Sequence, residues 1–313
     1  MPLIVVAVEA AMPALLGRNW LTQIKLNWSQ IFPSCQVNNV ADDVRTHAYW
    51  QNKFPEVFAD GLGTVVGTTA TLHLKPDATP KFHRPRPVPF AMREAVDKEL
   101  QRMEKEDIIE RVDFSQWATP LVCIAKKDGG VRVCGDYRIT VNQAINTDQY
   151  PIPTLNSVAS ILSRGKRFTK IDLKSAYQQI LLDEASQDIV TITTQKGLYR
   201  YKRLPFGVSS SSAIWQRFID QVIVDLPMTC SIMDDVLVSG ETDQEHHDNI
   251  VNLFNRFKQR GLRVKPAKCS FMQETVTYMG REIAEEGMRP TDEQVRAIRK
   301  APNPRTSSKY DHG

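Results

Sequence analysis

The sequence predicts an α+β fold, and two observations lead to that prediction. Short apolar runs separated by turn residues indicate β-hairpins at 121–134, 191–201, 230–240 and 276–283. Segments with one apolar stripe at helical spacing lie between them, at 91–106, 210–225 and 242–261. With 313 residues, 42% of them hydrophobic and 24% charged, the chain can bury a large core and form about two domains.

Composition excludes several classes of protein. The net charge of +4 permits a polyanionic partner without requiring one. No apolar run reaches the roughly 18 residues of a membrane span, and Glu9 interrupts the apolar start, so we predict neither a membrane protein nor a signal peptide. The five cysteines are scattered and form no Cys-x-x-Cys pair, which favours a reducing compartment and no structural zinc.

The first third of the chain contains an apolar strand-like run and then irregular segments. The polar, unpatterned stretch from residue 29 to about residue 50 is typical of a linker. Between residues 76 and 89, five prolines alternate with basic residues such as Lys81, Arg84 and Arg86. Proline cannot continue a helix, so this segment is predicted to run extended across a surface.

The next segments predict a helix and a hairpin. Met92, Val96, Leu100 and Met103 form the apolar stripe of the helix at 91–106. The hairpin has strands at 121–125 and 131–134, and the residues at its tip include Lys126, Lys127 and Arg132. Such a basic tip is either a solvated turn or a grip for phosphate, and the hairpin alone leaves both open.

Three aspartates occupy positions where strands end. Asp172 closes the strand predicted at 168–173 and precedes a short helix, which places it on an active-site face and not in a core. Asp234 and Asp235 have apolar residues on both sides and predict a strand, an acidic turn and a second strand. Two carboxylates at such a tip can hold a divalent metal, although an isolated pair of this kind is usually a solvated turn.

The last third of the chain predicts two more helices. Thr242 to Glu245 form a capping box, and the following helix carries an apolar stripe and ends at Gly261. His246 and His247 are expected on its polar, solvated face. A final helix is expected between Pro290 and Pro302, followed by a polar tail.

Taken together, the order and spacing of these segments resemble the reverse transcriptases of gypsy-class LTR retrotransposons, over about residues 52–304. The segments that carry the resemblance are 54–56, 72–76, 84–90, 117–120, 126–132, 135–137, 150–153, 168–172, 204–207 (Leu-Pro-Phe-Gly), 230–240 and 268–269. The resemblance implies a right-hand polymerase with fingers and palm subdomains and a partial thumb. Residues 1–30 resemble the C-terminal end of a retroviral-type aspartic protease through Leu16-Gly17-Arg18-Asn19.

The implied domains are a protease remnant at 1–30, a linker at 31–51, the polymerase at 52–304 and a disordered tail at 305–313. No Asp-Ser/Thr-Gly loop precedes the protease-like segment, so we expect no protease activity.

The resemblance also implies a catalytic centre. Strand extension displaces pyrophosphate at phosphorus, and two divalent ions roughly 4 Å apart serve the attacking and leaving oxygens. The ligands would be Asp172, Asp234, Asp235 and the backbone carbonyl of Leu173, which suit Mg²⁺, with Mn²⁺ as a substitute.

Other residues are implied around the substrates. Lys126, Lys127 and Arg132 would bind the triphosphate, and Phe206 and Gly207 would form the floor of the nucleotide pocket. Tyr177 would exclude a 2′-hydroxyl, unless it is a core tyrosine, and Lys268 would protonate pyrophosphate, unless it is a solvated lysine. The primer end would contact Ile232, Met233, Tyr278, Met279 and Gly280.

The implied function is RNA-directed DNA synthesis from dNTPs onto the 3′-OH of a primer on an RNA or DNA template. The implied location is a cytoplasmic element particle, with the nucleus as the alternative and other parts of the Pol polyprotein as partners.

Three departures from the family pattern support a second hypothesis. Ile232 stands where the family has Tyr, Ser211-Ser212 where it has Ala-Pro, and Trp215 where it has Phe. After Pro304 the thumb and ribonuclease H do not continue, so weak primer-template affinity and no ribonuclease H activity are expected. The alternative is therefore a catalytically decayed, truncated retroelement fragment that folds and can bind nucleic acid but does not polymerise.

Overall fold

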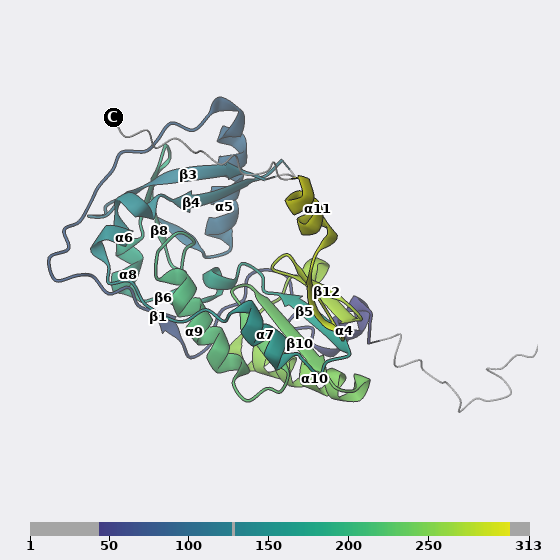
Figure 1. Ribbon diagram of the computed structural model, residues 1–313. Coiled ribbons are helices and arrows are strands. Elements are labelled where there is room, and N and C mark those ends of the chain that lie inside the picture. The colour runs from purple at the N-terminus through teal and green to yellow at the C-terminus, as the bar shows by residue number, and fades with distance from the viewer. Residues whose placement is uncertain (1–43, 127–128, 301–313) are drawn as a thin grey trace, which may run out of the picture. The chain divides into compact units, whose positions relative to one another are not determined.

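The computed structural model describes residues 44–126 and 129–300, without the side chains of residues 298 and 300 (Figure 1). The chain divides into two compact units, 1–43 and 44–313, and all described residues belong to the second. The predicted protease remnant, most of the predicted linker, Lys127 and the predicted tail lie outside the described residues.

The helices of the described chain are distributed along its whole length. The α-helices are α4 (His47–Lys53), α5 (Arg93–Lys105), α6 (Val141–Ala144), α7 (Leu155–Ile161), α8 (Glu184–Ile189), α9 (Ser211–Ile223), α10 (Asp243–Arg260) and α11 (Asp292–Lys300). The 3₁₀ turns are η1 (Phe90–Met92), η2 (Tyr137–Ile139), η3 (Ala176–Gln179) and η4 (Pro266–Lys268).

The strands form four sheets. An antiparallel sheet has the order β11 (Ser270–Gln273), β5 (Arg167–Asp172), β10 (Asp235–Gly240), β9 (Thr229–Ile232). A second has the order β2 (Ile109–Val112), β8 (Gly197–Tyr201), β7 (Ile192–Thr194), β3 (Thr119–Ala125), β4 (Val131–Gly135). The smaller sheets are β12 (Val276–Tyr278), β13 (Arg281–Ala284) and β14 (Gly287–Pro290), and the pair β1 (Thr69–Ala70) and β6 (Leu181–Leu182).

The four-stranded sheet packs against apolar residues on both faces. On one face Ile171, Val236 and Val238 belong to the main core together with residues of α9 and α10. On the other face Phe168 and Leu237 join a second cluster with residues of α7 and β12. Helices and a small sheet therefore fix this sheet from both sides (Figure 1).

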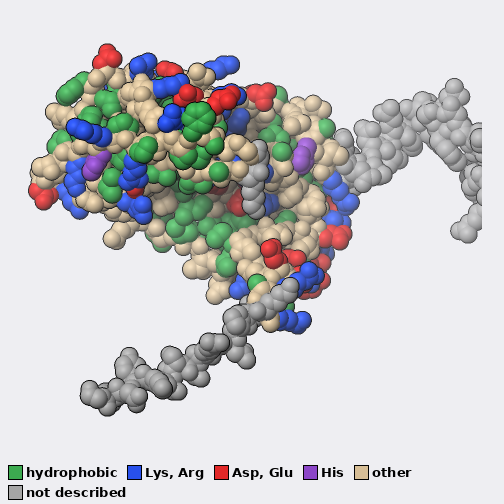
Figure 2. Space-filling view, turned by 90° about the horizontal axis from the view of Figure 1, so that it is seen from above, with side chains coloured by type: hydrophobic (Ala, Val, Ile, Leu, Met, Phe, Trp, Pro, Cys, Tyr) green, Lys and Arg blue, Asp and Glu red, His purple; other side chains and the backbone are tan. Residues whose placement is uncertain are grey.

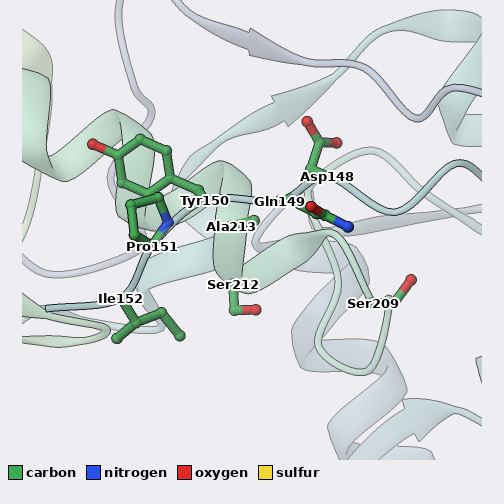
Figure 3. Close-up of a pocket in the computed structure, with 8 residues that line it drawn as sticks. All are labelled: Asp148, Gln149, Tyr150, Pro151, Ile152, Ser209, Ser212 and Ala213. Carbon is green, nitrogen blue, oxygen red and sulfur yellow. The ribbon is translucent and has the colours of Figure 1, made fainter. Parts of the chain in front are cut away.

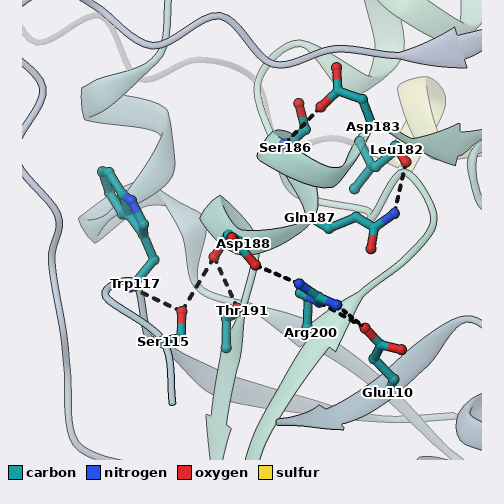
Figure 4. A network of polar contacts seen from close by, with 10 residues as sticks. All are labelled: Glu110, Ser115, Trp117, Leu182, Asp183, Ser186, Gln187, Asp188, Thr191 and Arg200. Atoms are coloured by element: carbon teal, nitrogen blue, oxygen red, sulfur yellow. Dashed lines mark hydrogen bonds and ion pairs between the residues drawn. The ribbon is translucent and has the colours of Figure 1, made fainter.

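The five-stranded sheet is reinforced by a polar network at its edge (Figure 4). Arg200 on β8 forms ion pairs with Glu110 on β2 and, at 2.7 Å, with Asp188 on α8. The carbonyl of Asp188 also accepts a hydrogen bond from the hydroxyl of Thr191 at 2.9 Å. The network connects α8 to β2 and β8, and so stabilises the sheet that contains the basic hairpin β3–β4.

Helix α4 lies across the end of the predicted linker and the predicted start of the polymerase. Residue 52 lies inside this helix, Trp50 is fully buried, and its ring packs on Phe54, Phe254 and Phe271. The compact unit that holds all described residues starts at Val44, and the predicted domain bounds stay a prediction.

The predicted hairpins and helices are present within a few residues of their expected bounds. The proline-rich segment is extended, as expected, with Phe82 bridging to Ala118. Strand β14 was not predicted, because Gly287–Pro290 carries no alternating apolar pattern. His246 is fully buried and not solvated.

The surface of the described chain mixes both signs of charge with isolated apolar side chains, as Figure 2 shows for one face. Phe90 and Phe114 are the most exposed large apolar residues, at 85% and 79%. No helix among the described residues is long and apolar enough to cross a membrane.

Candidate active site

The three aspartates meet at one end of the four-stranded sheet. In the antiparallel pair of β5 and β10, Asp172 lies directly opposite Asp235. The backbone N–H of Leu173 donates a 2.9 Å hydrogen bond to the carbonyl of Asp234, which extends the pairing into the turn. Asp172 and Asp235 therefore lie on the same face of the sheet, and Asp234 follows in the connecting turn.

The turn that carries Asp234 is held by helix α9. Met233 has a left-handed backbone conformation, with φ of 56°, which is unfavourable for a side chain of this size. Its N–H donates to Gln216 Oε1 at 2.9 Å, and its carbonyl accepts from Trp215 Nε1 at 2.7 Å. Gln216 Nε2 donates in turn to the carbonyl of Ser231 at 3.0 Å. These bonds fix both sides of the strained residue.

Gln216 and Trp215 were not predicted as site residues. The sequence singled out Trp215 as a departure from the family's Phe, and that departure gave no sign of a hydrogen bond to the turn. Gln216 is fully buried in the folded chain, and a buried amide needs hydrogen-bond partners. Its burial on the apolar side of α9 is therefore the feature that points to its role.

The carboxylates are close enough to affect one another. Burial, and then the charges of Asp172 and Asp235, raise the pKa of Asp234 to about 6. Two lysines offset the remaining charge: Lys268 Nζ lies 3.0 Å from Asp172 Oδ2, and Lys170 Nζ lies 2.9 Å from Asp235 Oδ2.

The donor set fits a hard divalent cation, although the described residues contain no group of three His, Cys, Asp or Glu side chains already arranged around a metal position. Carboxylate oxygens are the ligands that Mg²⁺ and Mn²⁺ prefer. After burial, the charges of Asp172 and Asp235 contribute to the raised pKa of Asp234, and a cation would offset their repulsion.

The predicted nucleotide residues cluster beside these aspartates. The rings of Tyr177 and Phe206 are 4.9 Å apart between centroids, and the Tyr177 hydroxyl donates to Met233 Sδ at 3.3 Å. The guanidinium of Arg132 lies 6.0 Å from the centroid of Phe206. Gly207 has φ of 93° and accepts a 3.0 Å hydrogen bond from Asn142 at its carbonyl.

Tyr177 is partly buried, and its other neighbour is the ring of Trp215 at 6.2 Å. Burial, and then the charge of Asp234, raise the pKa of its hydroxyl to about 12, so it is protonated at neutral pH. Its ring packs against the main core and its hydroxyl lies near Asp234, so both hypotheses for Tyr177 stay predictions.

Lys126 is exposed at the start of the β3–β4 turn, where its N–H bonds the carbonyl of Gly130 at 2.8 Å. Together with the exposed Arg132 on β4 it gives the hairpin its basic character.

Of the predicted primer residues, Met233 contacts Tyr177, whereas Ile232 and Tyr278 lie beside Asp235. Ile232 is Asp235's cross-strand partner and packs in one cluster with Tyr278, and both are buried. The Tyr278 hydroxyl donates to the carbonyl of Asp235 at 3.5 Å. Met279 and Gly280 follow in left-handed conformations, and Met279 is 58% exposed.

Ser211, one of the departures from the family pattern at the start of α9, forms a hydrogen bond within the fold. Ser211 is buried, and its hydroxyl donates to the carbonyl of Pro205 at 2.7 Å. Ser210, at the N-cap position, makes no capping bond with its side chain, which accepts instead the N–H of Asp148 at 3.0 Å.

A polar surface pocket of about 470 Å³ opens beside the same helix end (Figure 3). It is lined by Asp148, Gln149, Tyr150, Pro151, Ile152, Ser209, Ser212 and Ala213. None of the three aspartates of the candidate site lines this pocket.

Comparison with known proteins identifies the family. The family described as "Reverse transcriptase (RNA-dependent DNA polymerase)" matches residues 124–283, about half of the chain. This chain belongs to the reverse transcriptase family. The match contains all three aspartates and the turn between β9 and β10.

Similar proteins include retrotransposon polyproteins. The chain is 36% identical over 295 residues to an uncharacterized protein of Caenorhabditis elegans, which covers 92% of the chain and 23% of that protein. It is 30% identical over 244 residues to the retrovirus-related Pol polyprotein from transposon gypsy of Drosophila melanogaster. This match covers 75% of the chain and 23% of that polyprotein. The chain thus spans about a quarter of the length of these relatives.

Solved structures confirm the fold. A foamy viral protease-reverse transcriptase in complex with double-stranded DNA matches with a TM-score of 0.75 and 21% identity, over 88% of this chain and 48% of that one. A foamy viral protease-reverse transcriptase in complex with an RNA/DNA hybrid also gives a TM-score of 0.75, at 20% identity. That match covers 88% of this chain and 37% of the other. The reverse transcriptase therefore has the expected α+β right-hand architecture.

Proposed function

We propose that this reverse transcriptase region catalyses RNA-directed DNA synthesis, by nucleotidyl transfer from dNTPs to a primer 3′-OH. The observation that supports the proposal is the direct pairing of Asp172 with Asp235, with Asp234 held in the adjoining turn. Three carboxylates converging at the end of one sheet suit a reaction that develops negative charge on two oxygens.

Each residue group would have a distinct role. Asp172, Asp234 and Asp235, with the carbonyl of Leu173, would hold two Mg²⁺ ions, which supply charge stabilisation at the attacking and leaving oxygens when bound. Lys126, Lys127 and Arg132 would orient the triphosphate. Lys268, already beside Asp172, would donate a proton to the departing pyrophosphate.

Tyr177 and Phe206 would form the pocket for the sugar and base, with Gly207 at its floor. The Tyr177 ring, which packs beside Phe206, would lie under the sugar and exclude a 2′-hydroxyl. On the opposite side, Ile232, Met233 and the segment Tyr278–Gly280 would seat the primer end.

The foamy viral relatives were seen with DNA duplexes and an RNA/DNA hybrid, and we transfer such primer-template binding to this chain as part of the proposal. Other parts of a Pol polyprotein are further proposed partners. A cytoplasmic element particle is the proposed location, with the nucleus as the alternative.

Primer extension tests the proposal. Folded protein with Mg²⁺ or Mn²⁺ should extend an oligonucleotide on an RNA template with dNTPs. Asp234→Asn should lower the rate by about 10³-fold or more, because one ligand charge is lost at the reacting centre. The control Asp113→Asn changes an exposed aspartate and should keep the wild-type rate.

Retained extension by Asp234→Asn would contradict the metal assignment. The second candidate is a folded fragment that binds nucleic acid without polymerising, and Ile232 favours it, because a buried aliphatic side chain replaces a ring at the primer side. Duplex binding without extension by the wild-type chain would select this candidate.

A further inference from the structure

Lys170 is a charged residue on a mostly apolar face of the catalytic sheet. Alternation along β5 places it on the same face as Phe168 and Asp172, and its cross-strand partner is Leu237. Phe168 and Leu237 are fully buried, and only 25% of the Lys170 side chain is exposed. A lysine at such a position needs a partner that offsets its desolvation.

The partner is Asp235. Lys170 Nζ lies 2.9 Å from Asp235 Oδ2, and the Asp235 side chain is also only 25% exposed. The same ammonium lies 5.7 Å from the ring centroid of Tyr278, a buried residue whose hydroxyl donates to the Asp235 carbonyl. Lys170 is therefore held from two sides next to a proposed metal ligand.

Lys268 forms the corresponding pair with Asp172, but the two pairs differ in exposure. The Lys268 side chain is 57% exposed, so solvent screens its charge more strongly. The charge of Lys170 acts at closer to full strength because little water reaches it.

We propose that Lys170 is the counter-ion of Asp235 in the metal-free protein, and that its charge lowers the affinity of the carboxylate site for a divalent cation. This inference rests on the proposed function, since it concerns the same metal site. Before a cation binds, Lys170 keeps the Asp235 side chain in place. When one binds, the ammonium competes with it for the same carboxylate and repels it.

Binding of Mn²⁺ alone tests the role of Lys170, with free Mn²⁺ counted by electron paramagnetic resonance. Lys170→Met removes the charge and suits the apolar face, so the Kd for Mn²⁺ should fall on the order of tenfold. Lys170→Arg keeps the charge beside Asp235 and should restore the wild-type Kd. The control Lys166→Met removes a lysine charge just before the other end of β5, at an exposed position, and should leave the Kd unchanged.

A purely structural ion pair would change the melting temperature of Lys170→Met without tightening Mn²⁺ binding. Equal or weaker binding by folded Lys170→Met, or no Mn²⁺ binding by any variant, overturns the proposal. If Lys170→Met does not fold, the Kd for Mn²⁺ is measured on Lys170→Gln, which also removes the charge but keeps an amide that can donate a hydrogen bond to Asp235.

Primer extension distinguishes this inference from the proposed function. The Mg²⁺ concentration for half-maximal extension should fall in Lys170→Met, while the KM for dNTP stays unchanged. If no variant extends a primer and Mn²⁺ binding still tightens, the proposed function fails and the role of Lys170 stands.

Discussion

His246 shows how a single residue can escape sequence reasoning. Its neighbour His247 is also largely covered, with 18% of its side chain exposed and its ring packed beside Tyr49 and Trp50, but only His246 points toward the sheet and is fully buried. Gly240 on β10 makes this possible, since a Cβ there would lie 2.3 Å from the backbone nitrogen of His246. The polar His-His pair suggested solvent, and only the close approach of helix and strand decides which ring is buried.

The buried ring should make stability depend on pH. Burial lowers the pKa of His246 from 6.5 to about 4. The unfolded chain therefore takes up the proton first, so stability is full above about pH 6.5 and falls as the pH drops toward 4. At ~1.4 kcal/mol for each pH unit between the two pKa values, the loss reaches up to about 3 kcal/mol.

Urea unfolding between pH 4 and pH 7 measures this loss. His246→Leu should remove most of it, whereas the exposed His73→Gln should keep the wild-type pH dependence. An unchanged pH dependence in His246→Leu would show that other groups cause the acid loss.

At the scale of elements, the sequence predicted the acidic hairpin and the strand before Asp172 because each has its own local apolar pattern. It could not predict what holds the turn between β9 and β10, because the contacts come from α9. Gln216, which binds Met233, lies 17 residues before it in the chain. Helix α4 was missed for a similar reason: Trp50 finds its aromatic partners on α10 and β11.

Removing the glutamine should loosen the catalytic turn. Gln216→Leu leaves the N–H of Met233 and the carbonyl of Ser231 without their partners in a buried place, which should cost about 2–4 kcal/mol of unfolding free energy. Because Asp234 follows Met233 directly, Mn²⁺ binding should also weaken. Urea denaturation and Mn²⁺ titration measure the two effects.

The control for Gln216→Leu is Gln244→Leu, which removes an exposed glutamine on α10 and should change stability by less than about 0.5 kcal/mol. If the two variants are equally stable, the hydrogen bonds to the turn contribute nothing measurable.

At the scale of the whole molecule, the order of the motifs predicted the architecture and the convergence of the three aspartates. The arrangement of charge was not predictable in the same way. Lys170 and Lys268 are far apart in sequence, and only the packing of β11 beside β5 brings both lysines to the same carboxylate site. A net charge of +4 gives no information about such local pairing.

The net charge and the mixed surface bear on nucleic acid binding as a whole. A duplex would be held mainly through its phosphates, so counterions are released on binding and affinity falls with salt. If about four phosphates are contacted, the Kd for a primer-template should rise roughly 100-fold between 50 mM and 200 mM salt. Fluorescence anisotropy with a labelled primer-template measures this change.

The matched control for the salt series is a duplex of the same sequence with an uncharged backbone in one strand, which offers about half of the phosphates. Its salt dependence should be correspondingly shallower, because fewer counterions are released. Equal slopes for the two duplexes, or a Kd independent of salt, would mean that base or sugar contacts and not phosphates hold the nucleic acid on this reverse transcriptase.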